Sequence, residues 1–158
     1  MPLIEPPSVQ GLLNNFVSHC LEKNIALDLQ VWNQIVDIEI STVYLIRILS
    51  FLLDNALEAV EQTEAPQVQI HFSKDNTSTT ITVANSYLPL DDKIYLSIFK
   101  KNHKDIGLAI LSRSLKQYKN VRYTINKDPT TFTTTLTITA PDCFSFFCNQ
   151  TKKQSICT

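Results

Sequence analysis

Apolar residues recur at intervals of three and four in two stretches of the chain, a spacing that places side chains on one face of a helix. The first stretch follows Pro6-Pro7, and its apolar stripe consists of Val9, Leu12, Leu13, Phe16, Val17, Cys20 and Leu21. The second follows Ser41, a candidate N-cap, and runs to about Gln62 with Ile46, Leu49, Leu52, Leu53, Ala56, Leu57 and Val60 facing the core. The pattern predicts two amphipathic helices.

Elsewhere apolar and polar residues alternate, as they do in strands that bury one face. Alternation covers residues 25–32, 68–72, 79–83, 121–125 and 132–138, with turn residues at Asp75-Asn76 and at Lys127-Asp128-Pro129. Helical spacing returns once more, at Leu108, Leu111 and Leu115. This order predicts an α/β two-layer sandwich, in which about three helices cover one face of a mixed, mostly antiparallel sheet.

Composition fits a single domain with a sizeable core, because the chain has 158 residues, of which 44% are hydrophobic. Its net charge of −1 does not suggest a nucleic-acid binder. The sequence shows neither a membrane-spanning run nor a signal peptide, so we expect a cytoplasmic segment without membrane contact. We expect the domain over residues 8–140 and a tail over residues 141–158 that packs on it, meets a partner or hangs free. The four cysteines have no Cys-x-x-Cys spacing, which favours reduced thiols over a metal site.

Polar residues interrupt the apolar second helix at Asp54, Asn55 and Glu58. The segment Leu52-Leu53-Asp54-Asn55-Ala56-Leu57-Glu58-Ala59 resembles the N-box of the GHKL superfamily of ATPases and kinases. It is most similar to the form found in peptide-pheromone receptor kinases of Gram-positive bacteria, which serve quorum sensing. The resemblance implies a Bergerat-like fold in which the Asn55 side-chain oxygen ligates Mg²⁺ and the metal bridges the phosphates of ATP. Glu58 shares the face of Asn55. The alternative is a solvated helical face that carries these polar residues by chance.

Two further segments are similar to this family. Asn85, in Val83-Ala84-Asn85-Ser86 at a strand end, matches the position that accepts the adenine amino group, although ordinary turn chemistry explains it equally well. Ile98-Phe99 and Ile106-Gly107-Leu108 match the two ends of the family's phosphate-binding lid. The middle of that lid is shorter here, and Ala109 replaces its second glycine. The resemblance implies that Gly107 and Leu108 bind phosphate, and Lys101 and His103 in the unmatched middle would add point charges; the alternative is a flexible, solvated basic loop.

The resemblance implies the ATP-binding domain of a two-component sensor histidine kinase. Phe51 replaces the general-base Glu of the ATP-hydrolysing branches, so the expected reaction is phosphoryl transfer to a histidine. None of His19, His71 and His103 lies in an acceptor context, so the acceptor belongs to a separate dimerisation domain, in cis or in trans. A response regulator is an indirect partner, and the parent kinase can be membrane-anchored. The degraded lid keeps an alternative open: a pseudo-domain that binds proteins and no nucleotide.

Overall fold

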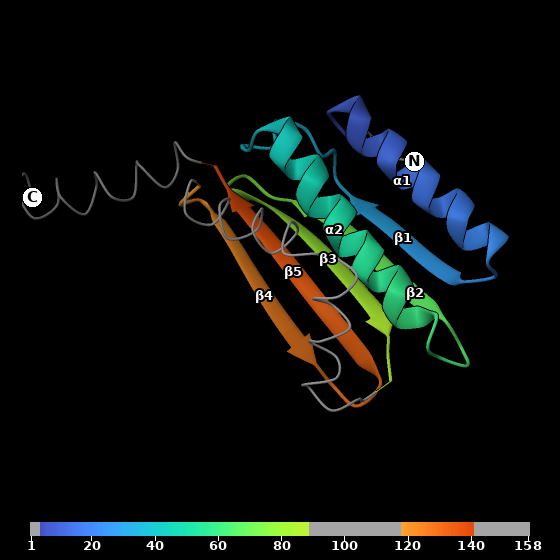
Figure 1. Ribbon diagram of the computed structural model, residues 1–158. Coiled ribbons are helices and arrows are strands. Elements are labelled where there is room, and N and C mark those ends of the chain that lie inside the picture. The colour runs from blue at the N-terminus through green and yellow to red at the C-terminus, as the bar shows by residue number, and fades with distance from the viewer. Residues whose placement is uncertain (1–3, 89–117, 141–158) are drawn as a thin grey trace, which may run out of the picture.

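The computed structural model describes residues 4–88 and 118–140, which form two layers (Figure 1). Its elements are α1 Pro7–Glu22, β1 Ala26–Trp32, α2 Thr42–Val60, β2 Gln67–Lys74, β3 Ser78–Ser86, β4 Val121–Lys127 and β5 Thr131–Thr139. Both helices lie on the same face of one sheet. The third predicted helix, at Leu108 to Leu115, falls outside the described residues. The described part therefore confirms the α/β sandwich and contains two helices.

The sheet has five strands in the order β1-β2-β3-β5-β4. β1 pairs parallel with β2, and every other pair is antiparallel, so the predicted mixed, mostly antiparallel sheet is confirmed. Both predicted hairpins form. In each turn an aspartate accepts backbone hydrogen bonds from the start of the return strand: Asp75 from Thr77 and Ser78, at 2.7 Å each, and Asp128 from Thr130 and Thr131, at 2.8 and 2.7 Å.

The core lies between the helices and the face of the sheet that they cover. Residues on this face alternate with polar ones, as in Val68, Ile70 and Phe72 of β2. Two details of the predicted helix faces differ from the structure. In α2, Ile46 and Leu57 are only partly buried while Leu45 and Ile48 are fully buried, because the stripe is rotated toward them. In α1, Leu21 is 73% exposed at the end of the stripe, whereas Cys20 is buried.

Two smaller predictions concern single side chains. Ser41 is the N-cap of α2 as predicted, but its side chain makes no capping hydrogen bond. Cys20 is a free thiol, and burial raises its pKa, which keeps it protonated and fits the predicted reduced state. Neither described helix combines the length and the apolar composition that crossing a bilayer requires.

Candidate functional site

Asn55 stands out among the residues of α2 because its side-chain oxygen is buried and has no hydrogen-bond partner in the described part of the chain. The helix places it there because its neighbours Leu52, Leu53 and Ala56 form the buried stripe. Leaving a buried carbonyl oxygen unsatisfied costs about 1–3 kcal/mol, and native structures contain few such groups. A buried oxygen without a hydrogen-bond donor, on an otherwise apolar helix, is therefore expected where a ligand donates or coordinates to that oxygen.

The two carboxylates of the same segment lie in different environments. Asp54 is exposed, and Glu58, one turn beyond Asn55, is half-buried. Both take part in interactions within the structure. Their placement agrees with the expectation that Glu58, rather than Asp54, shares the face of Asn55.

Asn85 is nearly inaccessible, with 4% of its surface exposed, at the end of β3. In the sheet it lies opposite Val68 on one side and Phe132 on the other, so its side chain belongs to the row that faces the helices. Its Nδ2 atom donates a hydrogen bond to the carbonyl oxygen of Ser86 at 3.0 Å. The described residues provide no hydrogen bond to its Oδ1 atom, so this oxygen can accept one from a ligand.

α2 and β3 bring the two asparagines into the same layer of the molecule. Figure 1 shows α2 running along the sheet over β3 in the same direction, so its last turns lie near the end of β3. Asn55 belongs to these later turns of the helix, and Asn85 is the second-last residue of the strand. The sequence-predicted metal ligand and adenine contact thus come from packed elements, which sequence spacing alone does not reveal.

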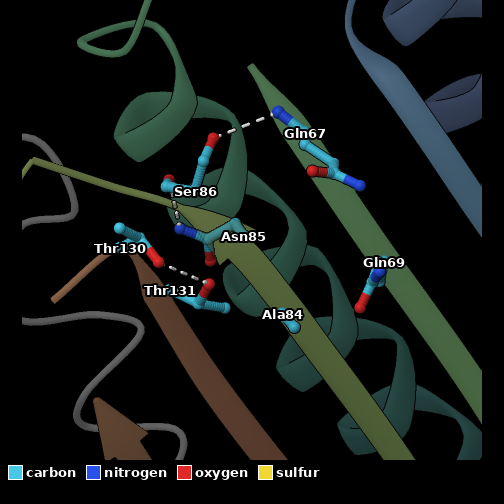
Figure 2. Close-up of a pocket in the computed structure, with 7 residues that line it drawn as sticks. All are labelled: Gln67, Gln69, Ala84, Asn85, Ser86, Thr130 and Thr131. Carbon is cyan, nitrogen blue, oxygen red and sulfur yellow. Dashed lines mark hydrogen bonds between the residues drawn. The ribbon is translucent and has the colours of Figure 1, made fainter. Parts of the chain in front are cut away.

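A partly open cavity of about 170 Å³ adjoins Asn85 where β3 ends and β2 and β5 begin (Figure 2). Its lining is Gln67, Gln69, Ala84, Asn85, Ser86, Thr130 and Thr131, which offers amides, hydroxyls and methyl groups but no ionisable side chain. Gln69 belongs to the sheet face that the helices leave uncovered, because it alternates with the buried Val68 and Ile70. Of the lining residues, sequence reasoning predicted only Asn85 as a ligand contact, since strand register alone brings β5 beside β3.

Several predicted site residues have no described position. Lys101, His103, Gly107 and Leu108 lie outside residues 4–88 and 118–140. Within those ranges, no three His, Cys, Asp or Glu side chains gather as a metal site built from such ligands would require. His71 lies on the uncovered face of the sheet, with its Nε2 atom 3.8 Å from Asp28 Oδ2. It therefore faces away from α2 and Asn55.

Comparison with known proteins identifies the family to which this fold belongs. Residues 38–139 match the family model described as the GHKL domain. The chain belongs to the GHKL domain family. The matched segment contains α2 and all of the sheet except β1, and with them both Asn55 and Asn85. No curated protein sequence matches the chain.

Solved structures share the fold of this GHKL domain at low sequence identity. The catalytic domain of the histidine kinase ThkA aligns with a TM-score of 0.67 and 18% identity, over 87% of this chain and 94% of that one. The Acinetobacter baumannii histidine kinase AdeS aligns with a TM-score of 0.62 and 12% identity, over 89% and 67%. Full-length ShkA in complex with AMPPNP aligns with a TM-score of 0.62 and 20% identity, over 84% and 30%.

Proposed function

We propose that this GHKL domain binds Mg-ATP and is the catalytic domain of a two-component sensor histidine kinase. The observation that carries the proposal is the buried, unpartnered Oδ1 atom of Asn55 on α2, inside the segment that matches the family. The similar ShkA structure contains the nucleotide analogue AMPPNP, which supports a nucleotide as the ligand class. The phosphoryl acceptor, the metal and the signalling role below are parts of the same proposal.

Asn55 fits a magnesium ion. Mg²⁺ prefers oxygen ligands, and a neutral amide oxygen completes its shell without adding a charge that would repel a triphosphate. When bound, the metal would neutralise charge on the phosphates and hold them for in-line transfer. Asn55 would hold it through Oδ1, and the half-buried Glu58 would accept hydrogen bonds from water in the same site.

Asn85 would recognise the base. Its Nδ2 atom is held by the Ser86 carbonyl, so Oδ1 would accept a hydrogen bond from the exocyclic amino group of adenine. Guanine presents a carbonyl oxygen at the equivalent position, and two acceptors facing each other repel. A buried polar group left unpaired by the wrong base is a strong source of selectivity.

The phosphate end of the nucleotide would contact Lys101, His103, Gly107 and Leu108. Lys101 and His103 would act as point charges, and the backbone N–H groups near Gly107 would bind phosphate oxygens at the start of a helix. The assignments of Gly107 and Leu108 come from the resemblance, and those of Lys101 and His103 come from their side-chain chemistry.

The acceptor would be a histidine on a separate dimerisation domain, in cis or in trans. His71 faces away from α2, so it is unsuited to receive a phosphoryl group from a nucleotide held at Asn55. A response regulator would be the indirect partner; ThkA, which shares this fold with 18% identity, was solved in complex with the response regulator TrrA. We further propose a cytoplasmic location and, from the form of the N-box, membership of the peptide-pheromone receptor kinases.

Thermal unfolding with and without Mg-ATP tests the nucleotide site. A ligand that binds only the folded state stabilises it by about 2.7 kcal/mol at one hundred times its dissociation constant. We expect Mg-ATP to raise the melting temperature by several degrees, a size typical for a domain of this length. ATP with EDTA should produce a smaller rise, and Mg-ADP reports the contribution of the γ-phosphate. No shift at millimolar Mg-ATP would refute the proposed function.

A further inference from the structure

Three elements of the described fold meet at one corner through two hydroxyl groups. Ser86, at the end of β3, has its Oγ atom 3.1 Å from the backbone nitrogen of Gln67, at the start of β2. The same Oγ atom lies 3.2 Å from Oγ1 of Thr63. Thr63 in turn donates a hydrogen bond of 2.8 Å to the carbonyl oxygen of Val60, the last residue of α2. Figure 2 shows Ser86 between Gln67 and the neighbouring Asn85.

This chain of hydrogen bonds can run in only one direction. A backbone N–H only donates and a carbonyl only accepts, so Ser86 accepts from Gln67 and Thr63 donates to Val60. The remaining proton, on Ser86 Oγ, must then point to Thr63 Oγ1. Each hydroxyl uses its single proton, and successive hydrogen bonds of this kind polarise and strengthen one another. We call Ser86 and Thr63 the hydroxyl relay.

The hydroxyl relay connects the two asparagines of the candidate site. Its Val60 end closes the helix that carries Asn55, and its Ser86 end follows Asn85 directly. Ser86 also accepts, through its backbone carbonyl, the Nδ2 hydrogen bond that fixes the Asn85 carboxamide. One residue therefore holds the C-terminal end of α2 through its side chain and orients Asn85 through its main chain.

We propose that Ser86 and Thr63 are positioning residues for the nucleotide site, setting the placement of Asn85 Oδ1 relative to α2 and thereby the preference for adenine over guanine. This inference rests on the proposed function. Without the hydroxyl relay the end of β3 can shift against α2, and the carboxamide of Asn85 can turn its nitrogen toward the base. A guanine carbonyl would accept from that nitrogen, so the discrimination between the two bases falls.

Isothermal titration of Mg-ATP and Mg-GTP tests the inference on the full chain. The variants are Ser86→Ala and Thr63→Val, which remove one hydroxyl each, and Thr63→Ser, which retains it. Thr82→Val is the matched control: this half-buried threonine of β3 makes no side-chain hydrogen bond that the structure shows. We expect Ser86→Ala and Thr63→Val to reduce the ratio of ATP to GTP affinity about five- to tenfold, the loss expected for one well-placed hydrogen bond. Thr63→Ser and Thr82→Val should keep the wild-type ratio.

One outcome would contradict only the inference about the hydroxyl relay, and another would contradict the proposed function. If wild-type protein binds Mg-ATP and the relay variants keep its ATP/GTP ratio, the hydroxyl relay is only structural and the inference is wrong, even if melting temperatures fall. If wild-type protein binds neither nucleotide, the proposed function itself fails. The side-chain NH₂ signals of Asn85 in NMR spectra give a second readout, since a change in their exchange rate in Thr63→Val reports lost orientation of the carboxamide without any ligand.

Discussion

The side-chain oxygen of Asn55, Oδ1, lowers the stability of the ligand-free domain at a position where we propose that it binds a ligand. It is buried on an otherwise apolar helix without a hydrogen-bond partner in the described residues. Such an atom lowers the stability of the ligand-free protein, and functional sites are where proteins retain such costs. Asn85, by contrast, is buried with its nitrogen hydrogen-bonded, so it is fixed before any ligand arrives.

Replacing Asn55 by leucine, a side chain of similar shape, should therefore stabilise the ligand-free domain. We expect the free energy of unfolding in urea to rise by about 1 kcal/mol, because the unsatisfied carbonyl is removed. Asn14→Leu, at an exposed position of α1, measures the gain from helix propensity alone and is subtracted. The same Asn55→Leu variant should lose all Mg-dependent stabilisation by ATP. A variant less stable than wild type would show that the Asn55 amide has a structural partner.

At the scale of elements, an aspartate in the turn stabilises each of the two hairpins in the same way. Asp75 and Asp128 each accept two backbone N–H groups at the start of the return strand, which closes the turn and fixes the register of the pair. The backbone N–H of Thr77, with that of Ser78, holds the pKa of Asp75 below its ordinary value. The backbone N–H groups of Thr130 and Thr131 do the same for the pKa of Asp128. These hydrogen bonds favour the ionised carboxylates.

Because the pKa values of Asp75 and Asp128 are lowered in the folded state, we expect acid to destabilise the hairpins. A carboxyl group whose pKa is lower in the folded state stabilises the fold above its unfolded pKa of about 4, and this contribution is lost as pH falls through the folded value. Urea unfolding at pH 6 and pH 3 should show a smaller drop in stability for Asp75→Asn/Asp128→Asn than for wild type. Glu64→Gln, which removes an exposed acid outside the turns, is the control for the loss of a negative charge. Equal drops in wild type and the double variant would refute the role of the turns.

At the scale of the molecule, the core runs almost from one end of the described chain to the other. Ile4 is fully buried and forms an isolated bridge with Ile35, although it precedes the predicted domain start at residue 8. The last core residue that the structure describes is Ile138. We therefore propose that the folded unit begins at or before Ile4 and extends at least to Ile138.

A chain that ends at Ala140 should keep the stability of the full chain. If the domain ends near residue 140, as the sequence predicts, its urea midpoint should be unchanged and its Mg-ATP stabilisation retained; the described core extends to Ile138. Ile4→Ala in the same chain should lower the free energy of unfolding by about 2–5 kcal/mol, as truncation of a buried aliphatic side chain does. A lower midpoint for the shortened chain would place part of residues 141–158 inside the fold.

The sequence alone determined the elements that depend on local chemistry. Apolar spacing predicted α1, α2 and the strands, and the turn aspartates predicted both hairpins, because helix and strand periods and turn geometry are encoded within a few neighbouring residues. The N-box predicted the family, since all of its residues are consecutive in the sequence and lie on a single helix. The exact buried face of α2 escaped this reasoning: Leu45 and Ile48 are buried where Ile46 was expected, because the packed neighbours set the rotation of a helix.

Only the tertiary structure decided how separate elements combine into a site. The isolation of Asn55 Oδ1, the engagement of Asn85 by Ser86, and the link from Ser86 through Thr63 to Val60 all depend on contacts across elements. So does the cavity beside Asn85, whose β3 and β5 residues meet by strand register. Periodicity shows which face a side chain takes, but the partner that a polar atom gains or lacks is set by the packing of residues distant in the chain.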